Sequence, residues 1–163
     1  MPDLEAVDLD FVTTARHRIR VERIINAPRP VLWDIITETA AWTEWFPTMS
    51  RCDAVSQRAT LGSSRTVKVG PLVAEETVIV ADSPLRWGFC ITHTNLPIAR
   101  RMVELLELDD VSDGERTRTR VNYTGAIDPP WFGRPTFRIT RRRVATTWRH
   151  GLDGLAQRAA ILS

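Results

Sequence analysis

The chain has 163 residues, with 22 basic and 20 acidic side chains and a net charge of +2. This near balance argues against a nucleic-acid-binding domain, which usually carries a clear basic excess on one face. The length favours a single domain, and 43% apolar residues argue against wholesale disorder. The longest uncharged stretch, residues 87–99, is too short and too polar to cross a bilayer, and the N-terminus lacks a secretory signal. We therefore expect a soluble, cytoplasmic protein with no integral membrane association and no nucleic-acid partner.

The N-terminal part of the chain predicts a strand followed by a short helix. Residues 1–15 are predicted to be an acidic, flexible leader, and residues 16–163 a single domain. Apolar and charged side chains alternate with period two over 17–25, which is typical of a half-buried strand. Pro28 then begins a short amphipathic helix whose apolar residues, over 31–36, have i/i+4 spacing.

A second short helix is predicted between Thr39 and Pro47, and a run of strands follows it. Short apolar segments alternate there with turn residues, a spacing that predicts hairpins and hence an antiparallel meander. The predicted strands lie near 49–56, 64–69, 72–81, 85–94, 99–109 and 116–127.

The C-terminal part predicts one long amphipathic helix that begins between Trp131 and Thr136. At about 100° per residue its apolar side chains collect in a single stripe. That stripe consists of Phe137, Val144, Trp148, Leu152, Leu155, Ala159 and Leu162. One amphipathic helix against one antiparallel sheet is a two-layer α+β arrangement. A curved sheet wrapped round the helix leaves a natural place for a small-molecule cavity.

The two cysteines, Cys52 and Cys90, are too few for a disulfide framework, and no histidine lies near either to suggest zinc. We interpret both as small buried hydrophobes. The sequence predicts no metal site and no cofactor.

Two segments carry a resemblance to a known family. The first strand runs into Ala27-Pro28-Arg29-Pro30-Val31-Leu32-Trp33, and the second short helix reads Trp42-Thr43-Glu44-Trp45-Phe46-Pro47. With the Asp113-Gly114 turn and the terminal helix, they make the chain similar to polyketide cyclase/dehydrase-type members of the START/Bet v 1-like (SRPBCC) superfamily. The resemblance covers residues 17–160.

This resemblance implies a helix-grip fold: a curved seven-stranded antiparallel sheet wrapped round a long C-terminal helix, with two short helices after the first strand. It also implies a deep hydrophobic cavity for lipids, polyketides or other apolar ligands. Only some members of the superfamily are enzymes, and the family has no universal catalytic signature. The fold therefore transfers to this chain more directly than any function.

Arg141 is the one charged residue that the helical wheel places inside the apolar stripe. A charge aimed at a cavity must be paired or must meet an anionic ligand. We therefore consider Arg141 a candidate for fixing a ligand oxygen. The alternatives are a guanidinium that reaches back to water or a pair with an inward glutamate. Arg141, Arg142 and Arg143 diverge by about 100° from one residue to the next, so they do not form one patch, and a solvated helix face is expected for this arginine run.

His93 is the candidate general acid or base, because it shares a strand face with Trp87, Phe89 and Ile91. The alternative is a structural, hydrogen-bonded histidine. Tyr123, the only tyrosine, is predicted to face inward and to donate either to a ligand carbonyl or to a buried polar group.

Two pairs of glutamates compete for inward positions. One of Glu75 and Glu76 must face inward if both lie in a regular strand, and the same ambiguity affects Glu104 and Glu107. An inward carboxylate is a candidate base, with Glu104 the one we retain beside His93 and Tyr123. A partner for Arg65 or Arg141 is the alternative role.

The remaining candidates are apolar or aromatic residues expected to border the cavity. The full set of predicted ligand-binding residues is Trp45, Phe46, Met49, Trp87, Phe89, His93, Tyr123, Phe137, Arg141, Val144 and Trp148. We expect the aromatic cluster near residue 45 either to gate the ligand path or to form a satellite core.

Three hypotheses follow for function. The first is a protein that binds or transports a hydrophobic small molecule, lipid- or polyketide-like and with an acidic group as one option. The second is a polyketide cyclase/aromatase or dehydratase with an inward His or Glu base and Arg/Tyr stabilisation of an oxyanion. The third is a protein-interaction module with a vestigial cavity.

Overall fold

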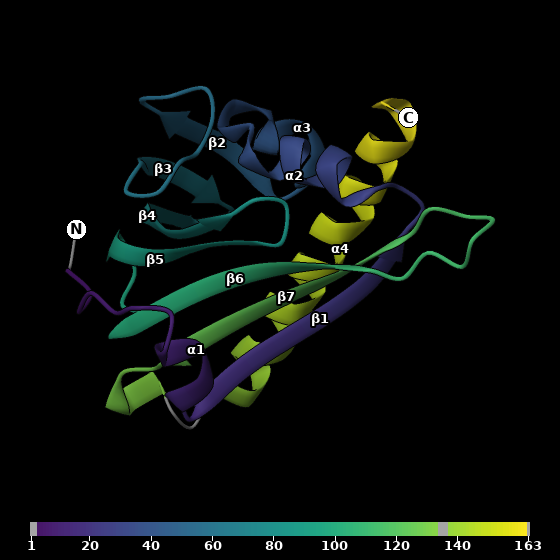
Figure 1. The fold of residues 1–163 in the computed structure, drawn as a ribbon. Coiled ribbons are helices and arrows are strands. Elements are labelled where there is room, and N and C mark those ends of the chain that lie inside the picture. Colours follow the sequence, from purple (N-terminus) through teal and green to yellow (C-terminus); the bar gives the residue numbers. More distant parts are fainter. Residues whose placement is uncertain (1–2, 134–136, 163) are drawn as a thin grey trace.

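The computed structural model of the protein describes residues 3–133 and 137–162. These residues form one seven-stranded antiparallel sheet in the order β1-β7-β6-β5-β4-β3-β2, with the long helix α4 across one face (Figure 1). In chain order the elements are α1 (Phe11–Thr14), β1 (His17–Ile25), α2 (Arg29–Thr37), η1 (Thr39–Ala41), α3 (Trp42–Trp45), β2 (Met49–Ala54), β3 (Ser64–Val69), β4 (Leu72–Asp82), β5 (Arg86–Thr94), β6 (Arg101–Asp110), β7 (Thr119–Asp128), η2 (Trp131–Gly133) and α4 (Phe137–Leu162).

This arrangement confirms the predicted helix-grip fold. The first strand occupies the predicted residues 17–25, and it pairs with the last strand from His17↔Ile127 to Ile25↔Thr119. Consecutive strands from β2 to β7 pair as hairpins, as the short turn spacing predicts. The sheet therefore runs as a meander from β2 to β7, and β1 returns to the far edge beside β7 (Figure 1).

Several predicted boundaries differ from the structure: β2 ends at Ala54 and not near residue 56, and β6 begins at Arg101 and not near residue 99. The last strand begins at Thr119 and not near residue 116, because backbone amides before Thr119 donate to side chains of the loop and not to β6. The Arg118 amide donates to Ser112 Oγ, and the Arg116 amide donates to Asp113 Oδ1. The predicted start of the long helix falls partly on residues 134–136, outside the described residues. Ahead of that gap, Trp131–Gly133 form the separate turn η2.

Residues 3–15, predicted to be a flexible leader, are folded against the sheet. Asp3 forms a bridge with His93 of β5, and the stretch from Val7 to Ala15 packs on the outer face, opposite α4 (Figure 1). Leu4, whose amide donates to the Thr92 carbonyl, is buried in the inner core, whereas Phe11 is buried on the outer face. The outer cluster comprises Phe11, Ala15, Cys90, Val103 and Ala126. The prediction failed because acidic residues in this segment mask apolar ones that cover an otherwise bare sheet face. Cys90 is buried as predicted, whereas Cys52 is half-buried.

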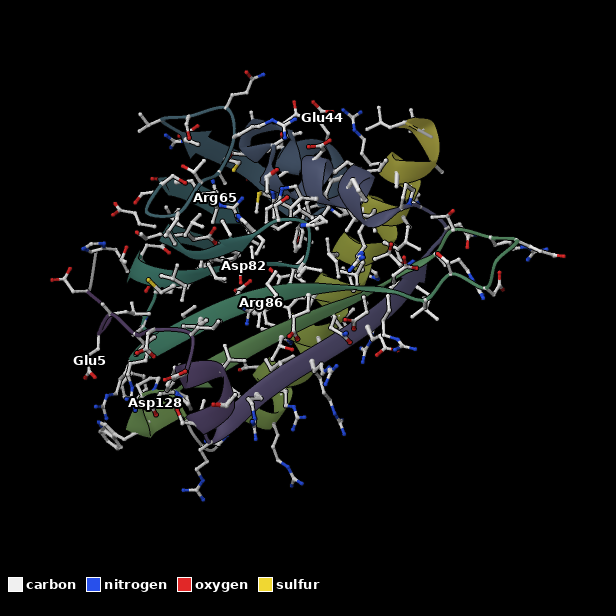
Figure 2. The ribbon with its side chains drawn as sticks, in the orientation of Figure 1. Glu5, Glu44, Arg65, Asp82, Arg86 and Asp128 are labelled. Atoms are coloured by element: carbon white, nitrogen blue, oxygen red, sulfur yellow. The ribbon has the colours of Figure 1, made fainter. Side chains whose placement is uncertain are left out.

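Charged contacts hold the same segment in place. Glu5 lies 3.2 Å from an Arg100 nitrogen, and Arg101 lies between Glu5 and Asp128, 2.9 Å from the latter. Figure 2 shows Glu5 and Asp128 at the same end of the molecule, near the end of β7. Exposed pairs of this kind contribute little each, so apolar burial carries most of the attachment.

Glycines allow the inner layer to pack closely. Gly125 in β7 faces the Trp148 ring, and Gly151 in α4 faces the Phe46 ring. Gly154 lies against the backbone carbonyl of Trp45, so that any Cβ at this position would overlap the carbonyl oxygen. The C-terminal half of α4 is therefore fixed against α3 by direct backbone contact.

We predict that Gly154→Ala destabilises the protein by about 2 kcal/mol or more, although Gly to Ala in an exposed helix normally gains about 1 kcal/mol. Gln157→Ala, at an exposed position one turn further along α4, is the control and should change stability by less than about 0.5 kcal/mol. Urea denaturation of the three proteins measures both. An unchanged or higher stability of Gly154→Ala would show that α4 does not contact α3 in this way.

Candidate functional site

An apolar cavity of about 340 Å³ lies between the inner face of the sheet and α4. Its walls come from α3, from β2 to β7 and from the first half of α4. The lining residues are Trp42, Phe46, Met49, Val67, Val69, Pro71, Leu72, Ala74, Glu76, Phe89, Ile91, Ile98, Met102, Glu104, Tyr123, Arg143, Val144, Thr147 and Trp148. The volume lies at the lower end of the range for small-molecule pockets.

The cavity has a buried base and a mouth at the surface. Phe89, Tyr123 and Trp148 form part of the base, each less than 5% exposed, and the last two rings stack with centroids 4.4 Å apart. The mouth residues are half-buried or exposed; they are Val69, Pro71, Leu72, Ile98, Arg143, Val144 and Thr147. The cavity therefore opens to the surface between the β3–β4 turn, the β5–β6 loop and α4.

Four buried polar side chains meet on the inner face of the sheet at the base. Arg65 Nε donates to Glu76 Oε2 at 2.6 Å, and the Tyr123 hydroxyl donates to Glu104. Arg65 extends from β3, at the end of the molecule covered by the short helices (Figure 2). Glu76, Glu104 and Tyr123 line the cavity directly, so the base has polar groups within an otherwise apolar wall.

Aromatic rings surround the Arg65 guanidinium. Its Cζ lies 4.1 Å from the centre of the Trp42 ring, 4.9 Å from that of Trp87 and 5.0 Å from that of Phe89. Cation–π contacts of this kind are strongest when the cation is desolvated, and Arg65 is only 5% exposed. The rings therefore compensate in part for the water that the guanidinium has lost.

Burial and mutual repulsion determine the charge of the two glutamates. Burial raises the pKa of Glu76, and the adjacent Arg65 opposes that rise. Burial also raises the pKa of Glu104, to about 8, with a further contribution from the charge of Glu76. Because only Glu76 has a cation beside it, Glu104 is the glutamate that keeps its proton at neutral pH. The base thus combines one compensated ion pair with a neutral carboxylic acid beside Tyr123.

The structure places the predicted site residues in two groups. Those that line the cavity are Phe46, Met49, Phe89, Glu104, Tyr123, Val144 and Trp148. Those that do not are Trp45, Trp87, His93, Phe137 and Arg141. Trp45 and Trp87 are buried behind the cavity wall, and the Phe137 ring packs against the His17 imidazole. The aromatic cluster near residue 45 is therefore part wall and part core.

The prediction for His93 was wrong, because this residue lies outside the cavity and is partly exposed. A β-bulge at Thr92 separates the Glu75–His93 pair from the Glu76–Ile91 pair. One extra residue in a strand inverts its inside–outside alternation. His93 consequently faces outward, with its Nδ1 3.0 Å from a Glu75 carboxylate oxygen, and has no access to a cavity ligand.

The prediction that Arg141 faces the cavity was also wrong. Its side chain is exposed and lines a solvent-open hollow beside β1, which Arg20, Arg138, Arg142 and Arg149 also line. The helix lies across the edge strand β1 here. This part of its apolar stripe therefore extends beyond the edge of the sheet, and the Arg141 guanidinium reaches water. That hollow is larger, at about 860 Å³, but its exposed arginines do not enclose an apolar molecule.

The pairing of the strands resolves the glutamate ambiguities and reveals residues that the predicted set omits. Glu76 and Glu104 face inward, and both are less than 8% exposed. Arg65 shares its strand face with Val67 and Val69, and this apolar alternation was the sequence signal for its burial. Arg143, expected on a solvated face, lines the cavity mouth.

Comparison with known proteins identifies the family. The sequence model of the polyketide cyclase / dehydrase and lipid transport family matches residues 16–160, and the chain belongs to this family. No curated protein matches the chain. In the parts of the chain that the structure describes, none of the helices has the length and apolar character needed to cross a membrane.

Solved structures share the fold at low sequence identity. A protein from Thermus thermophilus is 18% identical with a TM-score of 0.71, over 90% of this chain and 99% of that one. A START superfamily protein from Mycobacterium smegmatis is 13% identical with a TM-score of 0.68, over 90% and 99% of the two chains. A Thermobifida fusca protein is 20% identical with a TM-score of 0.66, over 90% and 95%. These likenesses establish the fold.

We predict that Glu104 makes the protein less stable as pH rises from 5 to 8. The folded protein holds a proton, with a pKa of about 8, that the unfolded chain releases near its ordinary pKa of 4.5. This contribution is complete below pH 4.5 and disappears as pH rises through 8, with a slope of up to about 1.4 kcal/mol per pH unit.

Urea denaturation of the wild type and of Glu104→Gln at several pH values measures this effect. Glutamine keeps the shape of the protonated acid but cannot titrate, so the difference in unfolding free energy between the two proteins should change steeply over this range. A constant difference would mean that Glu104 is ionised in the folded protein at neutral pH.

Proposed function

We propose that the protein binds and carries a hydrophobic small molecule, lipid-like or polyketide-like, in the cavity between the sheet and α4. The observation that carries this proposal is an apolar cavity that has a surface mouth and a base whose lining carboxyl and hydroxyl groups are already paired. Buried, unsatisfied polar groups at the base would disfavour an apolar ligand. Here Arg65 pairs with Glu76, and Glu104 with Tyr123, so an apolar body displaces no essential partner.

The cavity size limits the class of ligand. About 340 Å³ accommodates a medium-length acyl chain or a body of two fused rings, and larger lipids would have to extend through the mouth. Aromatic walls at Phe89, Tyr123 and Trp148 favour planar or flexible hydrocarbon over branched bulk. The membership in a family described as polyketide cyclase / dehydrase and lipid transport agrees with such ligands.

We predict that Ala74→Phe abolishes binding of the neutral fluorescent probe N-phenyl-1-naphthylamine, because the new ring fills the cavity from β4. Val73→Phe is the matched control, since the adjacent residue faces away from the cavity and should change probe affinity less than about twofold. Fluorescence titration gives the affinities, and circular dichroism checks that both variants fold. Equal probe binding by wild type and Ala74→Phe would place the probe elsewhere and contradict the proposal.

A second candidate function is proton transfer on a bound ketone, as in a cyclase or dehydratase, and one observation favours it. Glu76, Glu104 and Tyr123 line one cavity, with protonated Glu104 beside the Tyr123 hydroxyl. In this scheme the C–H bond next to the carbonyl breaks, its proton passes to the Glu76 carboxylate, and Glu104 donates a hydrogen bond to the enolate oxygen. His93 and Arg141 have no part in it.

We predict, for this second function, that wild-type protein accelerates deuterium incorporation into the methyl group of 2-acetonaphthone in D₂O. Glu76→Gln should lose the acceleration and Glu104→Gln should lower it at least about tenfold. Proton NMR follows the exchange, and His93→Gln serves as the control that should retain full activity. Exchange at the uncatalysed rate with wild-type protein, together with saturable binding of the ketone, would leave the carrier function alone standing.

A further inference from the structure

The mouth of the cavity continues into a second, polar hollow on the surface of α4. This hollow of about 430 Å³ is lined by Arg142, Arg143, Thr146, Thr147 and His150, which we call the polar annex. Arg143 and Thr147 line both the annex and the cavity. A molecule in the cavity can therefore extend past these two residues into the annex without leaving the protein surface.

The annex is positively charged and uncompensated. Ten other arginines form ion pairs within the described residues, whereas over the same residues neither Arg142 nor Arg143 has a carboxylate within 4 Å. The Thr147 hydroxyl adds a neutral hydrogen-bonding group beside the guanidinium groups, whereas the Thr146 hydroxyl donates to the Arg142 carbonyl. No carboxylate is among the described residues that line the annex.

The base of the cavity has the opposite character. Glu76 lines the base, and Arg65, the arginine with which it pairs, lies against the Trp42 ring and does not itself line the cavity. An anionic group at this depth would lose its water and face the Glu76 carboxylate, and none of the described residues that line the base is a cation. An elongated anion therefore has a single favourable orientation, with its apolar part at the base and its charged end at the mouth.

We infer that the site takes an amphipathic monoanion, an apolar body that ends in a carboxylate, and that Arg143 binds the carboxylate in the polar annex. The planar guanidinium offers two parallel N–H donors to a carboxylate, and Arg142 adds a second positive charge from the same hollow. This inference rests on the proposed binding function and specifies its ligand. Arg143 thus takes the role that the helical wheel assigns to Arg141.

Binding of decanoate and of decan-1-ol, measured by displacement of N-phenyl-1-naphthylamine at pH 7.5, tests the inference. The two ligands share a ten-carbon chain that fits the cavity and differ in the charge of the end group. We expect Arg143→Ala to weaken decanoate binding about tenfold and to change the affinities for decanol and the probe less than twofold.

Arg141→Ala is the matched control. This arginine lies two residues away on the same helix, is exposed and lies outside the ion pairs of the described residues, but lines neither the cavity nor the annex. It should leave all three affinities unchanged. Equal losses in Arg141→Ala and Arg143→Ala would indicate only a general electrostatic effect of the helix and would overturn the inference.

The remaining outcomes separate this inference from the function on which it rests. If probe and decanol bind but Arg143→Ala leaves decanoate affinity unchanged, binding stands and the anionic subsite is wrong. If probe, decanol and decanoate all fail to bind the wild type, both proposals fall together. Raising the salt concentration to 0.5 M should weaken decanoate binding but not decanol binding, which checks the ionic contact independently.

Discussion

The buried contact between Arg65 and Glu76 determines how the cavity can be used. The free energy lost when two opposite charges leave water exceeds their mutual attraction unless they are paired with good geometry. Here the pair is short, and three aromatic rings cover the guanidinium. Burial, with a further contribution from the charge of Glu76, raises the pKa of Glu104 to about 8, so Glu104 holds its proton at neutral pH beside the Tyr123 hydroxyl. One ion pair thus makes the base of an apolar cavity polar without making it charged overall.

The position of α4 gives this base its apolar enclosure. Gly151 and Gly154 bring the C-terminal half of the helix against Phe46 and the Trp45 backbone, whereas the Trp148 ring reaches Gly125 on β7. The first half of α4 contributes Arg143, Val144 and Thr147 to the mouth. The helix therefore closes the cavity at one end and leaves it accessible at the other, which is the geometry that a binding protein needs.

Periodicity made the architecture and a good part of the cavity predictable. The alternation over 17–25 and the hairpin spacing define the sheet, and the helical stripe through Val144 and Trp148 identifies the wall opposite it. These signals are local, and the structure follows them. Tyr123 faces inward as predicted because β7 is regular from end to end.

The failures have specific physical causes. A single extra residue at Thr92 moves His93 to the outer face, and no local sequence pattern marks that bulge. Arg141 has the wheel angle of a core residue, but the helix overhangs the sheet edge at this point, which is a property of tertiary packing. Arg65 lies on the same strand face as Val67 and Val69, an alternation that is visible in the sequence. Its partner is Glu76 and not Glu75 because the pairing of β3 with β4 puts Arg65 opposite Glu76, a register that the sequence leaves open.

The N-terminal segment on the outer face has a consequence for how the cavity can change over evolutionary time. Phe11 and Ala15 pack with outward residues of β5, β6 and β7, so the middle of the sheet has an apolar anchor independent of its inner surface. Substitutions that enlarge or reshape the inner wall therefore leave that anchor intact. Such a separation lets residues of the inner wall be substituted while the same sheet persists.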